Sequence, residues 1–429
     1  MFSEAAPNAW QLPVSVTSGT NVGTVLSFCY AGTELPGRIA RVRTRCYKAR
    51  LSSEGKAMAR DIRIEETADY LEKEGFEAML AACNGQNLFL DSNVVFVFSG
   101  VRPIGEAAVI IERSGRSTLV VTPAWDAERA ADLSRTDDTL GCDDLAEGVE
   151  RVLKKIKVNP ARVVTVALPT LFAQTASSIE RVLGGKCTAN DGFASQIARV
   201  RNADELAAGK KGTWIAERGY ERLREIVKPG MREFELTADL YCHMKGMGAE
   251  DNFLLLSASQ HNLAVRAAGH RKLDVGDIIL SEITPCYHGQ FVQICRTTVI
   301  GEPSPLLREK YKVLQDAMHR GQEAALPGTK VRDVANAIND VFREAGYGKY
   351  CQPPYMRVRG HGLGITSDRP GDITDDSEVV LEEGMVFVMH PNQYLPETGY
   401  LMCGEPVVIT PRGAESFSER DAELDFIPV

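Results

Sequence analysis

The chain has 429 residues, of which 44% are hydrophobic and 25% charged, values typical of a soluble globular protein with two or three domains. Its formal net charge of -9 argues against a nucleic-acid-binding protein, because such proteins need a basic surface. No apolar run approaches the length of a membrane span, and the N-terminus lacks the basic-then-apolar order of a signal peptide. We therefore expect a cytoplasmic protein that binds neither nucleic acid nor a membrane.

The chain contains 10 cysteines, but none of them forms a CxxC pair and their spacing is irregular. A disulfide framework or a zinc site would need a more regular pattern. We expect reduced thiols.

Residues 1–56 contain a stretch rich in Thr, Ser and Gly, followed by a basic run from Arg38 to Arg50. Two interpretations stay open: an arm that docks on a partner subunit, or a solvated N-terminal extension.

Residues 57–204 have an α/β pattern. A helix is expected to end over Ala68–Glu74, and apolar, β-branched runs predict strands at Ala78–Cys83, Val94–Phe98, Ala107–Ile111 and Thr118–Thr122. Helical segments alternating with strands follow, over Leu145–Lys157, Arg162–Ala167 and Phe172–Leu183. This alternation predicts a sheet flanked by helices, in a domain that ends near Arg199–Asp204.

Residues 205–429 contain an internal repeat. Each half has two helices separated by a Pro-Gly break, followed by an extended apolar segment. The first half comprises Glu205–Val227, Glu233–Gly246 and Phe253–Ser257, and the second comprises Leu307–Ala325, Arg332–Gly346 and Tyr355–Val358. Two units of one layout predict a pseudo-two-fold domain with a pocket between its halves.

Several short motifs in a fixed order carry a family resemblance over about residues 57–429. They are Arg201–Glu205, Val275–Leu280, Arg296-Thr297, Gly360–Gly364, Leu381–Phe387 and Gly404–Thr410, together with the two Pro-Gly helix pairs. In these motifs the chain resembles the creatinase/aminopeptidase P/methionine aminopeptidase family, whose catalytic domain is called the pita-bread fold. The resemblance implies an α/β (α+β) protein with a creatinase-type N-terminal domain and a pita-bread catalytic domain.

The peptidases of this family bind two divalent metal ions through two Asp, one His and two Glu. By resemblance, these five positions correspond here to Glu282, Gln293, His361, His390 and Gly404. Only the His is unchanged and one carboxylate remains, which is too little negative charge for two dications. An alternative stays open, because Glu282, His361 and His390 form a two-His-one-carboxylate set that can bind a single metal ion.

Creatinase is a member of the family that works without a metal, so the resemblance implies a metal-independent hydrolase of a small C–N compound such as an amide, lactam, ureido or guanidino compound. The resemblance also implies that this protein needs no cofactor and forms a homodimer with shared active sites. The catalytic candidates are His361, His390, Glu282 and His261, because His and Glu carry acid-base chemistry. The substrate-binding candidates are Gln293, Arg369, Arg102, His270 and Glu405.

Several of these residues also have interpretations that involve no function. Glu282 can be a structural carboxyl paired with Arg296, Arg369 can form a salt bridge with a neighbouring Asp, and His261 and His270 can be solvated loop residues. Cys286, Cys295 and Cys403 lie on the same strands, where cysteines are more often inert core residues than nucleophiles. Two further functions remain: a mononuclear metal-dependent hydrolase or lyase, and a non-catalytic pita-bread binding module.

Overall fold

The computed structural model describes residues 50–51, 57–58, 62–86, 88–90, 93–185, 187–367 and 370–429. The prediction for residues 1–56 therefore falls almost entirely outside the described residues. Of that segment only β1, Arg50–Leu51, is described, and it pairs with β2, Ala57–Met58, in antiparallel fashion. None of the described helices is long and apolar enough to cross a membrane.

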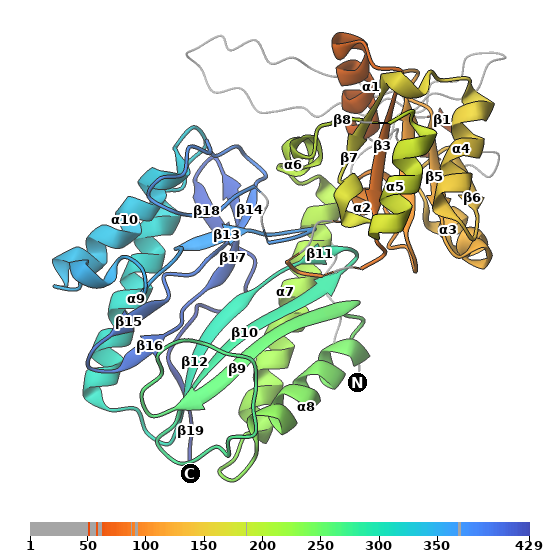
Figure 1. The fold of residues 1–429 in the computed structure, drawn as a ribbon. Coiled ribbons are helices and arrows are strands. Elements are labelled where there is room, and N and C mark those ends of the chain that lie inside the picture. The colour runs from red at the N-terminus through yellow and green to blue at the C-terminus, as the bar shows by residue number, and fades with distance from the viewer. Residues whose placement is uncertain are drawn as a thin grey trace, which may run out of the picture.

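The first domain is built on a six-stranded mixed sheet with the order β6-β5-β4-β3-β7-β8. The strands are β3 (Ala78–Cys83), β4 (Ala107–Glu112), β5 (Ser117–Val121), β6 (Asp138–Gly141), β7 (Val163–Val166) and β8 (Thr188–Ala189). Helices α1 (Ile62–Glu74), α3 (Ala127–Leu133), α4 (Leu145–Ile156), α5 (Ala173–Val182) and α6 (Gly192–Ala198) surround it (Figure 1). Strand β3 is buried on both faces, which explains its continuous apolar sequence. The predicted α/β pattern is confirmed.

One predicted strand of this domain is a helix. Val94–Phe98 forms most of α2, Val94–Ser99. The Asn93 side chain accepts a hydrogen bond from the Phe96 backbone N–H, and Gly100 ends the helix with a φ of 71°. These two caps decide the structure, because a short apolar run is compatible with either a buried strand or a buried helix turn.

The junction between the domains is fixed by a buried ion pair. Helix α7, Ala203–Ile226, begins with a capping box between Asn202 and Glu205. Glu205 also accepts two hydrogen bonds of 2.7 Å from the Arg63 guanidinium of the first domain. This bidentate pair ties the start of the second domain to α1.

The second domain contains the two predicted helix pairs. Helices α7 and α8 (Glu233–Gly246) accompany a sheet of β9 (Asp251–Ser259), β10 (Ile278–Tyr287), β11 (Gln290–Phe291), β12 (Ile294–Ile300) and β19 (Asp425–Ile427). Helices α9 (Pro305–Ala324) and α10 (Val331–Glu344) accompany β13 (Gly360–Gly362), β14 (Val386–Met389), β17 (Glu405–Thr410) and β18 (Gly413–Ser416). A separate hairpin joins β15 (Gln393–Leu395) to β16 (Gly399–Leu401). The predicted repeat is present, but Tyr355–Val358 is not a strand and follows a series of turns instead.

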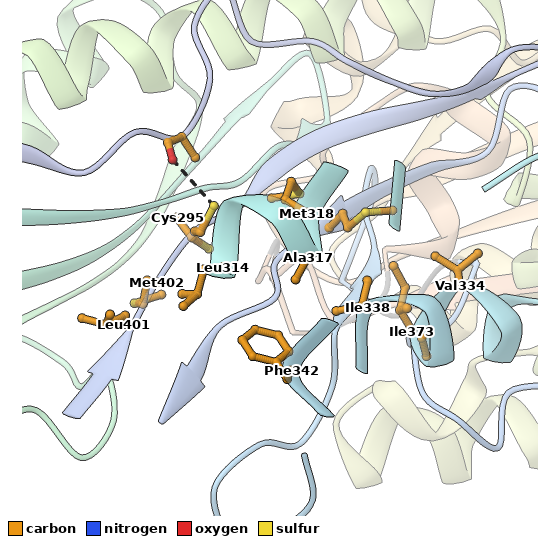
Figure 2. Close-up of a cluster of buried hydrophobic side chains, with 14 of the residues drawn as sticks. Cys295, Leu314, Ala317, Met318, Val334, Ile338, Phe342, Ile373, Leu401 and Met402 are labelled. Atoms are coloured by element: carbon orange, nitrogen blue, oxygen red, sulfur yellow. Dashed lines mark hydrogen bonds between the residues drawn. The ribbon is translucent and has the colours of Figure 1, made fainter. Parts of the chain in front are cut away.

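The two halves of this domain share one core. Side chains of α9 and α10 pack on strand residues of the sheets, and Figure 2 shows Leu314, Met318, Ile338 and Phe342 converging beside Cys295 of β12. All of these side chains are buried. Burying each one stabilises the fold by about 1.5–3 kcal/mol. The core therefore fixes β12, which carries part of the candidate site.

Candidate functional site

Strands of two sheets bring the predicted site residues together. Glu282 of β10 lies directly opposite Cys295 of β12, and Cys295 in turn pairs with Gly404, just before β17. His361 lies on β13, which pairs with β14, and His390 immediately follows β14. The structure thus places the polar side chains where the two halves of the repeat meet.

Glu282 is the titratable centre of this pocket. It is only partly exposed, and burial raises the pKa of its carboxyl from 4.5 to about 7. The neighbouring Tyr400 of β16 has its pKa raised, first by its own burial and then by the charge of Glu282. Glu282 can therefore exchange a proton near neutral pH.

The two pocket histidines are close together and neutral. The ring centroids of His361 and His390 lie 5.2 Å apart, in an edge-on arrangement. Burial lowers the pKa of both imidazoles, that of His390 to about 3, where the neighbouring His361 contributes further. His361 Nδ1 lies 3.0 Å from the Gly362 carbonyl oxygen, while the buried His390 Nδ1 has no hydrogen-bond partner among the described residues. His390 is therefore positioned to bind a polar group of a ligand.

Neutral hydrogen-bonding groups fill the rest of the pocket floor. Gln293 is 1% exposed, and its amide contacts the Thr284 hydroxyl at 3.4 Å and the Cys295 sulfur at 3.5 Å. Burial raises the pKa of the Cys295 thiol well above its usual value, so it stays protonated. A nucleophilic role for Cys295 therefore has no support.

The donors present do not fit a pair of divalent ions. A Cβ atom placed on Gly404 would lie 2.8 Å from the Cβ of His390 and 2.9 Å from the Cys295 sulfur. The space for a glutamate at position 404 is therefore taken by these two side chains. Among the described residues, no group of three or more His, Cys, Asp or Glu side chains is arranged to hold a metal ion.

The other predicted substrate-binding residues lie elsewhere. Arg102 forms a 3.0 Å ion pair with Glu250, and the exposed His270 packs its ring against Phe234. Glu405 is 3% exposed and pairs with Arg296 at 2.9 Å. These contacts engage Arg102, His270 and Glu405 with other protein groups, so substrate binding by these residues stays a prediction, and Arg369 lies outside the described residues.

His261 lies at the edge of the region and not on the pocket floor. It is exposed, and its Nε2 atom is 3.2 Å from the Pro396 carbonyl oxygen in the β15–β16 hairpin. The next residue continues this link, since the Asn262 carbonyl accepts a 2.7 Å hydrogen bond from the Tyr400 N–H. His261 therefore connects a loop to the hairpin that carries Tyr400.

Two residues of the site were not found from the sequence. Tyr400 lies in a hairpin without periodic pattern. Phe89 comes from the first domain, where its ring meets those of His361 and Phe253 at 5.8 and 5.1 Å. No local signal indicates that a residue 272 positions away in the chain closes the wall beside His361 (361 minus 89).

Comparison with known proteins finds similarity over the second domain and over most of the chain. Residues 210–411 match the model of metallopeptidase family M24. The Xaa-Pro dipeptidase of Pyrococcus furiosus is 26% identical over 340 residues, which cover 77% of this chain and 92% of that protein. These matches support the pita-bread family assignment.

Solved structures of similar proteins have the same fold as this chain. The prolidase from Pyrococcus horikoshii OT3 superposes with a TM-score of 0.73 at 22% identity, covering 84% of this chain and 100% of that one. The Xaa-Pro dipeptidase from Bacillus anthracis superposes with a TM-score of 0.74 at 21% identity, covering 85% and 99%. The match includes both domains, so the expected architecture is confirmed.

The M24 relatives correct the predicted activity. We expected a metal-independent hydrolase of a non-peptide C–N bond, but the similar proteins are named dipeptidases, within a metallopeptidase family. The expectation of a hydrolase is supported, and the expectation of a creatinase-like substrate is not. The changed ligand positions suggested a metal-independent enzyme, whereas the proteins similar over most of the chain are named dipeptidases.

Proposed function

We propose that this protein hydrolyses the peptide bond of a dipeptide-sized substrate, and that Glu282 moves the protons. The names of the relatives that match both domains support the substrate class. The observation that carries the proposal is the Glu282 carboxyl, whose pKa of about 7 allows both protonation states at neutral pH. Proton transfer by a positioned carboxyl typically contributes about 10²–10⁴-fold to a rate.

The pocket residues have separate tasks in this proposal. Glu282 as a carboxylate takes a proton from the attacking water, and as a carboxylic acid it returns that proton to the leaving amine. The neutral His390 and Gln293 bind polar groups of the peptide, because neutral donors and acceptors suit an uncharged amide. Tyr400 lies beside Glu282, and burial keeps the pKa of the Glu282 carboxyl raised.

The test is release of amino acids from a panel of Xaa-Pro dipeptides, other dipeptides and tripeptides. We expect dipeptides to be cleaved and Glu282→Gln to lower kcat at least about a hundredfold. The matched control is Glu383→Gln, because Glu383 is an exposed carboxylate of the same domain and should leave kcat unchanged. Absence of cleavage of every dipeptide in the panel by the unmodified protein would exclude the proposal.

We further propose that the pocket does not carry the two-ion set of the M24 peptidases. The crowding around Gly404 and the amide at Gln293 support this. Elemental mass spectrometry of protein equilibrated with Mn²⁺, Co²⁺ or Zn²⁺ should find fewer than two bound ions per chain. A comparison variant, Gln293→Asp with His390→Glu, supplies two further carboxylates and should bind more. Two tightly bound ions in the unmodified protein would show that the proposal is wrong.

The expected homodimer with shared active sites, the cytoplasmic location and the domain limits at residues 57–204 and 205–429 stay predictions. Phe89 shows that the first domain of the same chain already contributes to the wall beside His361. A second subunit is therefore not required to explain that wall.

A further inference from the structure

A second polar cavity lies behind the candidate pocket. It has a volume of about 160 Å³, enough for about five water molecules or a small organic ion. One wall is a single face of α7, where Glu217, Tyr220, Glu221 and Arg224 follow one another at helical spacing. The facing wall consists of Arg296 and of C-terminal residues that include Asp421 and Glu423.

The cavity contains an unsatisfied buried carboxylate oxygen. Glu217 is 6% exposed, and its Oε1 atom accepts the backbone N–H groups of Glu419 and Arg420 at 2.9 and 3.2 Å. Among the described residues, its Oε2 atom has no hydrogen-bond partner. Because an unsatisfied buried polar atom is costly, this oxygen favours the binding of a group with a hydrogen-bond donor.

The charge balance of the lining favours a cation. Five carboxylates and three guanidinium groups line the cavity. Each arginine already has a carboxylate partner: Arg224 pairs with Asp425 at 2.9 Å, Arg420 with Glu221 at 3.3 Å, and Arg296 with Glu405 at 2.9 Å. Among the described residues, this leaves Glu217 on the floor and Asp421 and Glu423 at the mouth without an ion-pair partner. An anion in the cavity would meet guanidinium groups that are already paired with carboxylates. It would also meet the unpaired carboxylates, which would repel it.

The kind of cation follows from the arrangement of the oxygens. No cluster of three metal-ligating side chains occurs among the described residues, so a divalent metal ion has no coordination shell here. A primary ammonium group has three N–H donors and a compact charge, which matches one floor carboxylate and two carboxylates at the mouth. The remaining volume accommodates a short alkyl chain beside the Tyr220 ring.

We propose that this cavity binds the ammonium group of a small primary amine, with Glu217 as its principal partner. The site is separate from the candidate pocket but connected to it through one side chain. Arg296 lines the cavity and donates hydrogen bonds to the carbonyl oxygens of Cys295 and Gly404 at 3.1 and 2.8 Å. These two residues pair with each other beside Glu282, so the Arg296 wall of the cavity is one residue away from the candidate site.

The experiment is a titration of the full chain with ethylammonium chloride, followed by isothermal calorimetry and by the thermal unfolding midpoint, at constant chloride. Saturable binding is expected, and Glu217→Gln should weaken it at least about tenfold, since one charge-assisted hydrogen bond is lost. The glutamine keeps an oxygen for the two backbone N–H groups, so the fold should survive. The matched control, Glu225→Gln, lies on the same helix outside the cavity and should bind as the unmodified protein does.

A second variant tests the proposal without changing a buried side chain. Asp421 is exposed at the mouth, and Asp421→Asn should weaken binding about two- to threefold. The proposal is overturned if the unmodified protein shows no saturable binding, or if Glu217→Gln binds ethylammonium equally well. Equal saturation by sodium or potassium chloride would also overturn it, because the site would then not recognise an amine.

Discussion

Two glutamates on strands of different sheets have the same raised pKa but different partners. The pKa of Glu282 and that of Glu405 are both raised to about 7 by burial. Glu282 has no cationic partner among the described residues, whereas Glu405 is held by Arg296 at 2.9 Å and by a hydrogen bond from Ser418. A perturbed pKa therefore does not identify the reactive group by itself. The carboxyl without a permanent partner is the one that is free to act on a substrate.

The largest expected effect comes from removing the partner of Glu405. Arg296→Ala leaves a buried carboxyl and two carbonyl oxygens without their donor, so we expect a loss of about 3–5 kcal/mol in the free energy of unfolding. Urea unfolding measures it at pH 8. Arg224→Ala is the control, because the pair of Arg224 with Asp425 is partly exposed and should contribute at most about 1 kcal/mol. Equal losses in the two variants would mean that burial does not distinguish the pairs.

The register of the strands explains why this pairing was missed from the sequence. The alternative in which Glu282 pairs with Arg296 is wrong, because Glu282 lies opposite Cys295 while Arg296 lies opposite Ser281. Successive side chains of a strand point to opposite faces, so Arg296 faces away from Glu282 and toward Glu405. Only the register, which the sequence does not display, shows the difference.

The local patterns predicted the fold well where they were long. The predicted strand at Ala78–Cys83 and the predicted helix at Glu233–Gly246 have the observed limits of β3 and α8. The prediction of a strand at Val94–Phe98 was wrong because five residues are too few for periodicity to separate a strand from a helix. The pocket was partly predictable, since the spacing of the motifs brings Glu282, Gln293, His361 and His390 together. Tyr400 and Phe89 join it only through tertiary contacts.

The next expected effect concerns pH. If the Glu282 carboxylate is the base, kcat/KM should rise with pH through about 7, and Glu282→Gln should lack this step. The effect on stability has the opposite sign. The folded pKa of about 7 exceeds the ordinary value of 4.5, so the native state retains the proton longer. Its stabilising contribution is present below pH 4.5 and is lost as the pH rises through 7.

Two measurements separate these effects. The pH profile of dipeptide hydrolysis and the pH dependence of urea unfolding are compared between the unmodified protein and Glu282→Gln. A profile that keeps its rise in the Gln variant would assign the titration to another group. The titration of Glu405, whose pKa is also about 7, should affect only the unfolding data. Its carboxyl contacts Arg296 and does not face the candidate site.

The smallest effect is expected at His261, which the sequence suggested as a catalytic base. Its imidazole is exposed and 3.2 Å from the Pro396 carbonyl, so its contribution is that of one surface hydrogen bond to the hairpin, about 0.5–1.5 kcal/mol. His261→Ala should therefore lower kcat/KM by less than about tenfold and leave its pH profile unchanged, since the group that titrates is Glu282. His261→Gln, which can still donate to the carbonyl, should recover most of the loss. A loss in kcat/KM as large as that of Glu282→Gln, without recovery in His261→Gln, would mean that His261 takes part in the proton transfer. The assignment of the site to a carboxyl without a permanent partner would then be wrong.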